Sequence, residues 1–465
     1  MDHAFRRAGW ILCLAAGSAA AQPAPSPSSS SDTQALRREL AAMRAEYEAR
    51  IQALEQRVQA AEAAVAAPAA SVAAPAPSVA AIAAPPPAPA AGGGFQPALS
   101  LILSGGYFNS RQDPATYRIR GFSLPPDAEI GPGVRGFSLG ESELGLAANI
   151  DPWFRGAANI SFAPDNTVSV EEAYVETTSL GNGLNLRAGR FFSNIGYLNP
   201  QHSHVWDFAD APLAYQAMLG TQFDDDGVRL TWLAPTDRFV ELSAEAGRGR
   251  GFPGSDTSRN GAGMYSLAAH TGGDIGESHS WRAGVSYLHT RASDQDLVAF
   301  DPAGSEIRNR FTGGTGVWIA DAVWKWAPNG NATRTNFKLQ GEYLQSRRDG
   351  TMVVDAFGAA SPGDYRASQS GWYLQGVYQF MPHWRVGLRT ERLSPGSPSY
   401  GINTALVGND GGAPMKNTAM VDWSPSEFTR WRLQVAQDRA RPGASDLQWL
   451  IQYQMSLGAH GAHSY

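Results

Sequence analysis

One stretch of the chain gathers several side chains that could do chemistry. Between Ile195 and Asp226 there are two histidines two residues apart, two aspartates three residues apart and several aromatic rings. The candidate residues of this stretch are Tyr197, His202, His204, Trp206, Asp207 and Asp210. Imidazole and carboxylate groups are suitable ligands for a divalent transition metal. Their spacing matches no zinc signature. We therefore expect hydrogen bonding within a loop, with no metal and no other cofactor.

The rest of the chain offers no motif for catalysis. It has no nucleophile elbow, no phosphate-cradling glycine loop and no metalloprotease helix motif, so we do not expect an enzyme. The single cysteine, Cys13, lies near the start of the chain, so the mature protein is expected to have no thiol or disulfide. The net charge of -6 argues against nucleic acid as a partner, because such proteins present a basic surface.

From Leu99 onward, apolar and polar residues alternate with a period of two. In the last such segment every second residue from Leu447 to Leu457 is apolar, and most residues between them are glutamine or serine. Such alternation predicts strands with one apolar and one polar face. We expect sixteen of these strands, at residues 98–109, 137–150, 153–163, 168–179, 184–194, 227–234, 238–249, 263–270, 280–292, 314–327, 334–347, 369–381, 384–393, 415–424, 428–439 and 446–458. The predicted fold is all-β, a 16-stranded antiparallel transmembrane β-barrel with lipid outside and water inside.

The connectors between the predicted strands differ in length according to their order in the chain. We number each connector by the strand that it follows, so even connectors follow the second, fourth and later even strands. The even connectors are short and contain turn-forming residues, as at Gly181–Gly183, whereas most odd connectors are long. Two odd connectors, 164–167 and 440–445, are short exceptions. The tryptophans near the even connectors are Trp153, Trp232, Trp281, Trp326, Trp384 and Trp423. We expect these rings to form one interfacial girdle on the periplasmic side of the barrel.

The longest odd connector, 195–226, contains the six candidate residues named above. A loop with so many aromatic side chains would expose a large apolar area if it lay in water. We therefore expect it to fold into the barrel as a constriction loop that narrows the lumen. The alternative is an ordered external loop at a contact between subunits of a trimer.

Strand parity also assigns charged side chains to the inner wall, because the residues between lipid-facing positions face the lumen. The predicted pore-lining residues are Arg187, Arg229, Glu241, Glu245, Lys338, Glu342, Arg385, Arg389, Arg430 and Arg432. The same parity would add, unless bulges shift it, Glu141, Glu143, Glu172 and Glu176. One wall is then rich in carboxylates and the other in guanidinium groups. These charges either tune ion selectivity or pair with one another and keep the lumen wet.

Composition separates the N-terminal part of the chain from the strand-rich remainder. Residues 1–21 combine two arginines, an apolar run and an alanine-rich end, which predicts a secretory signal peptide. A linker, 22–31, leads to 32–67, whose apolar residues have heptad-like spacing typical of a periplasmic α-helical coiled-coil segment or of a single solvated helix. Residues 68–94 are a linker rich in alanine, proline and glycine. The barrel domain is expected at 95–465.

Three segments resemble the phosphate-selective porin O/P family of Gram-negative outer membranes. They are Gly136–Leu144 (GFSLGESEL), Val170–Val175 (VEEAYV) and Leu186–Phe191 (LRAGRF). The resemblance implies a sixteen-stranded homotrimeric porin with an inward third loop. It also implies that basic residues line the constriction of the phosphate channels in that family.

The sequence therefore predicts a passive diffusion channel in the outer membrane of a Gram-negative bacterium. Such a channel contacts lipid and admits small polar or charged solutes, anions among them. One alternative is a TonB-dependent, metal-related receptor-like protein, although such receptors have about 22 strands around a plug. Another is a structural envelope tether that uses the helical segment. A third is a barrel enzyme built on the residues around His202.

Overall fold

The computed structural model describes residues 97–256, 260–355, 358, 361–408 and 411–458. The predicted signal peptide, coiled coil and linkers lie outside the described residues. All the described residues belong to one compact unit, residues 77–465. None of the helices in these ranges is long and apolar enough to cross a membrane.

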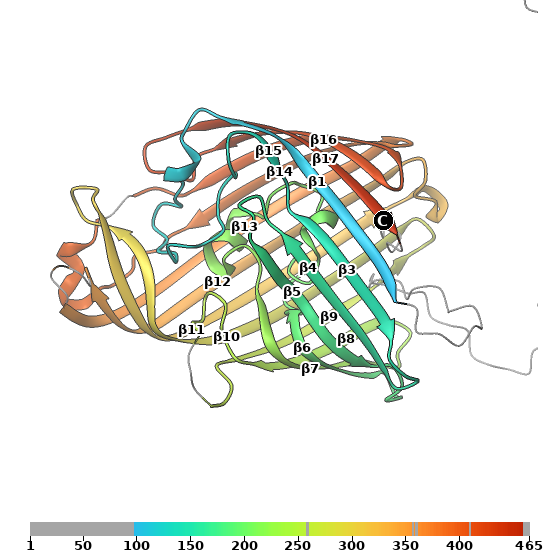
Figure 1. Cartoon of the computed structure of the whole chain (residues 1–465), viewed down its shortest axis with the longest axis horizontal. Coiled ribbons are helices and arrows are strands. Elements are labelled where there is room, and N and C mark those ends of the chain that lie inside the picture. The colour runs from blue at the N-terminus through green and yellow to red at the C-terminus, as the bar shows by residue number, and fades with distance from the viewer. Residues whose placement is uncertain (1–96, 257–259, 356–357, 359–360, 409–410, 459–465) are drawn as a thin grey trace, which may run out of the picture. The chain divides into compact units, whose positions relative to one another are not determined.

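Strand segments make up most of the described chain (Figure 1). Their bounds are β1 (Ala98–Ser110), β2 (Gly136–Leu139), β3 (Ser142–Asn149), β4 (Phe154–Phe162), β5 (Val168–Thr177), β6 (Leu184–Phe192), β7 (Asp224–Leu233), β8 (Phe239–Gly247), β9 (Met264–Ile275), β10 (His279–Phe300), β11 (Glu306–Trp326), β12 (Asn336–Val354), β13 (Ser361–Met381), β14 (Trp384–Ser394), β15 (Met415–Ser426), β16 (Thr429–Asp438) and β17 (Asp446–Gly458). The helical segments are α2 (Leu213–Leu219) and the short 3-10 turns η1 (Pro114–Thr116), η2 (Ser203–Val205), η3 (Pro328–Gly330) and η4 (Gly401–Leu406).

The strands form one closed antiparallel sheet. Neighbours in the chain are neighbours in the sheet, and β1 pairs with β17 to close the ring. Both β2 and β3 pair with β1, so they are two halves of one strand, and the 17 segments make sixteen strands around the lumen. This confirms the predicted 16-stranded antiparallel barrel. Closure gives the backbone groups of both end strands a partner, as a barrel in lipid requires.

A bulge interrupts the predicted strand 137–150. Between β2 and β3, three residues lie opposite two residues of β1, so one residue is extra. The interruption falls at Gly140 and Glu141. Glu141 reaches the inner side of the barrel, where it accepts hydrogen bonds from Ser161 Oγ (2.8 Å) and Ser203 Oγ (3.1 Å). A bulge re-aims side chains in this way because it breaks the strict alternation of the strand.

A second bulge lies in β5. The pairing of β4 with β5 shifts by one residue between Asn159 and Ile160, which leaves Glu171 as the extra residue. Glu171 and Glu172 consequently both approach His202 in the lumen. Both bulges therefore add carboxylates to one part of the inner wall.

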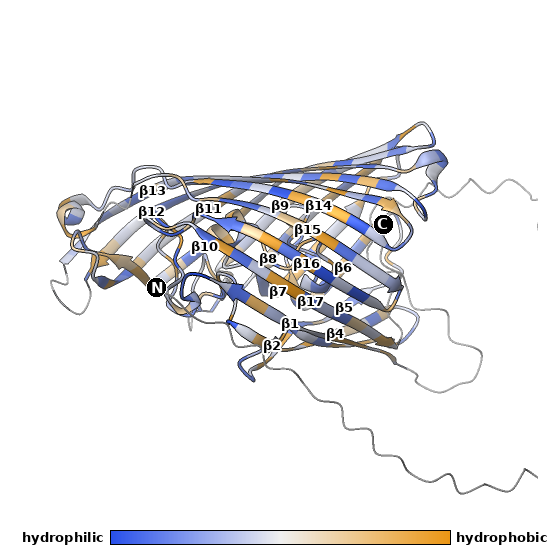
Figure 2. Cartoon of the chain, turned by 90° about the horizontal axis from the view of Figure 1, so that it is seen from above, coloured by the Kyte–Doolittle hydropathy of each residue, from blue (hydrophilic) through white to orange (hydrophobic). Residues whose placement is uncertain are grey.

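The outer face of the barrel is apolar and bordered by two aromatic rims, and the strands show alternating hydropathy along their length (Figure 2). At the short-turn end the exposed rings include those of Trp153, Trp232, Trp324, Trp423 and Trp431. Toward the long-loop end they include those of Tyr107, Tyr265, Trp318, Tyr343, Trp372 and Trp449. Trp384 and Trp423 stack with their ring centroids 6.0 Å apart. The predicted girdle is one of two, and a pair of girdles around an apolar band is typical of transmembrane barrels.

Strands β10 to β13 extend well beyond the second rim (Figure 1). The expected long connectors 293–313 and 348–368 are therefore wrong, because most of their residues continue the strands. In this extension the outer face is charged, as in the exposed pairs Arg310–Asp296 and Arg366–Asp349. The inner face is apolar and forms a small core that includes Leu297, Phe311, Met352, Val354 and Tyr365. The polarity is thus the reverse of that between the two aromatic rims.

Candidate functional site

The long connector between β6 and β7 folds into the barrel, and we call residues Ser193–Phe223 the constriction loop. The predicted range of 195–226 ends too late, because Asp224–Asp226 pair with β6 as part of β7. Asn199 closes the neck of the loop. Its Nδ2 donates to the carbonyls of Ser193 and Phe223, both at 2.8 Å, and its Oδ1 accepts from the backbone N–H of Phe223 at 2.8 Å.

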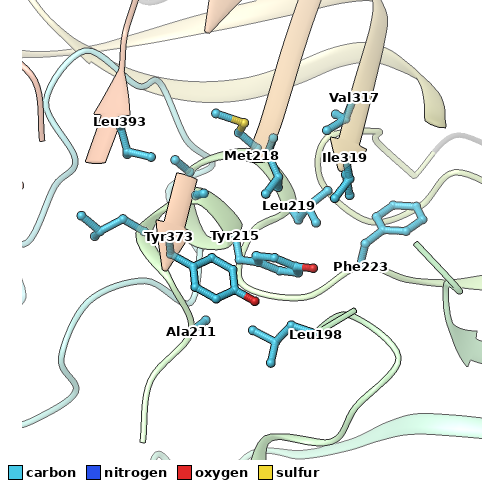
Figure 3. Close-up of a cluster of buried hydrophobic side chains, with 14 of the residues drawn as sticks. Leu198, Ala211, Tyr215, Met218, Leu219, Phe223, Val317, Ile319, Tyr373 and Leu393 are labelled. Carbon is cyan, nitrogen blue, oxygen red and sulfur yellow. The ribbon is translucent and has the colours of Figure 1, made fainter. Parts of the chain in front are cut away.

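The constriction loop carries α2 into the interior of the barrel, where every residue of this helix is buried. Figure 3 shows its side chains against those of the barrel strands, with the rings of Tyr215 and Tyr373 close together. The β1–β2 connector packs on the same core through Ile119 and Leu124. The sequence did not predict this second contribution. The core fills part of the lumen with apolar side chains.

Glu342 of β12 anchors the constriction loop to the wall. Its carboxylate accepts hydrogen bonds from the backbone N–H groups of Tyr197 (3.1 Å) and Leu198 (3.0 Å). It also accepts from the hydroxyls of Tyr215 (2.8 Å) and Tyr373 (2.5 Å). Glu342 is buried, so the three donors of Tyr197, Leu198 and Tyr215 hold the loop against a carboxyl group that Tyr373 of β13 also contacts. Its inward parity is as predicted, but it is closed off from the aqueous space by the loop that it holds.

The two aspartates of the constriction loop bind the basic part of the inner wall. Asp207 pairs with Lys338 and with Arg385 Nη1, the latter at 3.3 Å. Asp210 pairs with Arg389 Nη2 (2.9 Å) and with Lys416 Nζ (2.5 Å). Burial raises the pKa of both carboxyls, but these cations have the larger combined effect and hold the pKa below its ordinary value. Both aspartates are therefore charged at neutral pH.

The two histidines lie on the opposite, acidic side of the lumen. His202 Nε2 is 3.0 Å from Glu172 Oε2, and His204 Nδ1 is 2.9 Å from Glu143 Oε2. The possible set of two histidines and two aspartates is therefore wrong, because the aspartates face cations on another part of the wall. The histidines contact glutamates that the two bulges bring inward. Sequence spacing alone could not have paired them.

All ten predicted pore-lining residues are on strands and have inward parity, but they differ in access. The buried ones are Arg229, Glu241, Glu245, Glu342, Arg389 and Arg432. The side chains of Lys338 and Arg385 are 20% and 27% exposed, compared with 1% for Arg432. Arg187 is 12% exposed and pairs with Glu176 at 2.8 Å. Parity therefore does not separate the accessible side chains from those in closed ion pairs.

Arg432 and Asp422 form one of these closed ion pairs. Asp422 accepts from Arg432 Nε (2.7 Å) and Nη2 (2.9 Å), and from Arg385 Nη2 (2.6 Å). We expect Arg432→Met to destabilise the folded barrel by about 3–5 kcal/mol, because it leaves a buried carboxylate short of its main partner. The midpoint of urea unfolding in lipid vesicles measures this loss.

The matched control is the double variant Arg432→Met with Asp422→Leu. Replacing both members of a buried pair by apolar groups is far less costly than removing one, so the double variant should recover most of the stability. Equal midpoints for the single and double variants would contradict the assignment of Arg432 as a structural residue.

Several functional candidates were missed by the sequence. Glu171 lies beside His202, next to Glu143 and Glu172, which parity had added conditionally, and Lys416 binds the constriction loop. Lys325 of β11 is the register partner of Lys338. Period-two alternation does identify Lys325 and Lys416 as inward, because their neighbours at i±1 are outward. Glu171 could not be found in this way, because it is the extra residue of the bulge in β5.

Comparisons with known proteins give one relative and several similar folds. No family model matches the chain. An uncharacterized protein of Aquifex aeolicus (strain VF5) is 31% identical over 351 residues, which are 71% of this chain and 70% of the relative.

Among solved structures, the in-vitro folded trimer form of the outer membrane protein OmpT of Vibrio cholerae has a TM-score of 0.46 and 11% identity, over 78% of this chain and 99% of that one. The anion-selective porin from Comamonas acidovorans has a TM-score of 0.47 and 10% identity, over 78% of this chain and 100% of that one. The outer membrane channel DcaP of Acinetobacter baumannii has a TM-score of 0.43 and 11% identity, over 78% of this chain and 98% of that one. Because these sequence identities and TM-scores are low, the function has to be argued from the barrel's own residues.

Proposed function

The chain belongs to the same family as the uncharacterized protein of Aquifex aeolicus, and for this member we propose a passive channel of the outer membrane that admits small polar solutes and prefers anions. The closed sheet has an apolar outer face between aromatic rims and a polar inner face. A water-filled barrel in lipid requires this distribution. The resemblance to the phosphate-selective porin O/P family adds phosphate to the anions that deserve testing.

The observation that carries the anion preference is a pair of lysines that face each other across neighbouring strands. Lys325 and Lys338 are register partners on β11 and β12, and both have inward parity. The guanidinium of Arg282 and the ammonium of Lys338 lie 5.4 and 5.9 Å from the ring centroid of Tyr197 in the constriction loop. Like charges at opposed positions repel each other. Asp207, which pairs with Lys338 and with Arg385, offsets only part of this positive charge, so the site favours anions.

We propose two roles for the charged inner wall. Lys338 and Arg385, the more exposed cations, meet the solute beside the constriction loop. Arg389 and Arg432, which are almost fully buried, hold the loop and the wall in place. This division explains why a charge count alone does not give the selectivity.

The experiment that tests the anion preference is the reversal potential of the channel in a planar bilayer under a salt gradient. We expect the double variant Lys325→Gln with Lys338→Gln to shift the reversal potential toward cations, because two positive charges leave the narrow part of the lumen. Potassium chloride and potassium phosphate gradients should both show the shift.

Arg366→Gln is the matched control, because Arg366 is 78% exposed in the extension beyond the membrane. It removes a similar charge far from the lumen, so the reversal potential should stay unchanged. An unchanged potential in the lysine double variant would contradict the proposed anion path. A protein without any conductance steps would contradict the channel itself.

The proposal also gives the barrel an orientation and an assembly. The short-turn end, where both termini of the barrel lie, would face the periplasm, and the long-loop end would face outward. A homotrimer is proposed on the family resemblance. The receptor-like alternative is not favoured, because such barrels have about 22 strands and the described barrel has sixteen. The tether alternative depends on residues 32–67, which lie outside the described residues.

A further inference from the structure

We propose that Glu143, His202 and His204 bind a divalent transition metal ion of the Zn²⁺ type, at the point where the constriction loop meets β3 and β5. We call these three residues the His–Glu site. The site lies on the acidic side of the lumen, and the proposal does not depend on the conductance or the selectivity of the channel.

The ligand atoms of the His–Glu site already converge. His202 Nδ1 and His204 Nδ1 lie 3.3 and 2.9 Å from the same oxygen, Glu143 Oε2. One ligand atom from each of the three residues lies within 4.8 Å of the others. Ligand atoms bound at about 2.0–2.2 Å to a tetrahedral zinc ion are themselves about 3.3–3.6 Å apart. A small outward movement of the side chains would therefore admit the ion.

The ring of His202 is oriented by contacts on its other side. Its Nε2 lies 3.0 Å from Glu172 Oε2, and Glu172 Oε1 accepts a hydrogen bond from the backbone N–H of Phe192 at 3.2 Å. A metal-binding histidine commonly donates its second ring N–H to a carboxylate, which fixes the tautomer and the ring orientation. Asn159 Nδ2 also lies 2.9 Å from this Nε2. In the tautomer in which Nε2 donates to Glu172, Nδ1 keeps its lone pair on the side of Glu143.

The charge around the site favours a cation. The carboxylates near the two imidazoles are those of Glu141, Glu143, Glu171 and Glu172. Arg187 lies 4.0 Å from Glu172 but is shared with Glu176, to which it is closer at 2.8 Å. The ring nitrogens that face these carboxylates are the atoms that a metal ion would bind in place of protons. A single divalent ion would contact one ligand atom of each residue of the site at once.

The donor set indicates which ions fit. Two imidazole nitrogens with a carboxylate oxygen suit Zn²⁺, Ni²⁺ or Cu²⁺, whereas Ca²⁺ and Mg²⁺ prefer oxygen ligands alone. The fourth position could be taken by Glu171, whose Oε2 is 3.3 Å from His202 Nδ1, or by water. A bound ion would cross-link the constriction loop to the barrel wall.

The test uses full-length, untagged protein that is refolded from inclusion bodies into detergent. A sample prepared in this way contains no lipopolysaccharide, which would itself bind metal ions. After treatment with a chelator and dialysis, we expect Zn²⁺ to bind at one equivalent per chain in isothermal titration calorimetry, with no comparable binding of Ca²⁺. His204→Ala and Glu143→Gln should each weaken Zn²⁺ binding strongly, by more than about tenfold, because each removes a ligand. Glu172→Gln should weaken it by about tenfold through the orientation of His202.

His289→Ala is the matched control. His289 lies on β10 with outward parity, next to Tyr265, so its removal should leave Zn²⁺ affinity unchanged. Circular dichroism and heat-modifiable migration confirm that each variant is folded, and Glu171→Gln provides a milder variant if a stronger one fails to fold. The absence of stoichiometric Zn²⁺ binding to the folded protein would overturn the proposal. So would binding that His204→Ala, Glu143→Gln and Glu171→Gln all leave intact. Neither result would affect the conductance experiment.

Discussion

Replacing residues 201–221 of the constriction loop by a short glycine–serine linker is expected to raise single-channel conductance several-fold. The removed segment contains α2 and both loop aspartates, which lie inside the barrel against its wall. The deletion keeps Asn199 and Phe223, whose hydrogen bonds close the neck of the loop. Conductance should rise because the open cross-section of the channel increases. Single-channel recording in planar bilayers measures the change.

The deletion should also make the channel more selective for anions. Without Asp207 and Asp210, the cations Lys338, Arg385 and Lys416 lose their partners in the loop. The matched control is Asp207→Asn with Asp210→Asn, which removes the same charges but keeps the obstruction. This control should gain anion selectivity with nearly unchanged conductance. If the deletion left conductance at the level of the intact channel, the loop would not be the constriction.

Glu342→Ala is expected to release the constriction loop from the barrel wall. The substitution removes the acceptor of two backbone N–H groups and two tyrosine hydroxyls in a buried position. Each buried donor that loses its acceptor costs about 1–3 kcal/mol, so the loss in loop stability should amount to several kcal/mol. Amide hydrogen exchange should become much faster at residues 197–219, and the open-channel current should become noisier.

Two control variants separate this effect from a general loss of charge. Glu342→Gln keeps the shape of the side chain and one good acceptor. Its amide exchange rates should therefore lie between those of the unsubstituted protein and those of Glu342→Ala. Glu306→Ala removes a carboxylate that is half exposed in the extension and should leave the loop protected. Unchanged exchange at 197–219 in Glu342→Ala would show that the apolar packing of α2 holds the loop without this anchor.

The positions of the strands and their facing were largely predictable from the sequence. The predicted strand 446–458 has the observed bounds of β17, and residues such as Lys338 and Arg432 have the expected inward parity. This succeeds because the signal is local. A strand between lipid and water must place apolar side chains on every second position, whatever the rest of the chain does.

The prediction of strand bounds failed where the outer face of the barrel no longer lies between the two aromatic rims. Residues 293–313 were expected to be a connector, but they continue β10 and β11 beyond the second aromatic rim. There the outer face meets water and the inner face packs on a small core, so Leu297 and Phe311 point inward. The pattern is inverted relative to the lipid-facing part, and a search for lipid-facing alternation cannot identify it.

The candidate sites were predictable only in part. The aromatic content of the loop indicated that it folds inward, and the presence of cations on one wall followed from parity. The partners of individual side chains could not be predicted from either pattern. Asp207 meets Lys338 from a distant strand, and His204 meets Glu143 because a bulge interrupts the strand before it. Such contacts depend on the path of the loop across the lumen, which no local pattern encodes.

The sequence by itself determined that this chain has one apolar and one polar surface along each strand, because a strand between an apolar and a polar environment has a period of two whatever the rest of the chain does. It also determined which end of the barrel has the short turns. Only the tertiary structure decided which lumen charges are closed ion pairs, which lysines oppose each other, and how two histidines meet Glu143. These depend on strand register, on bulges and on the docking of a loop, which are fixed by contacts between residues far apart in the chain.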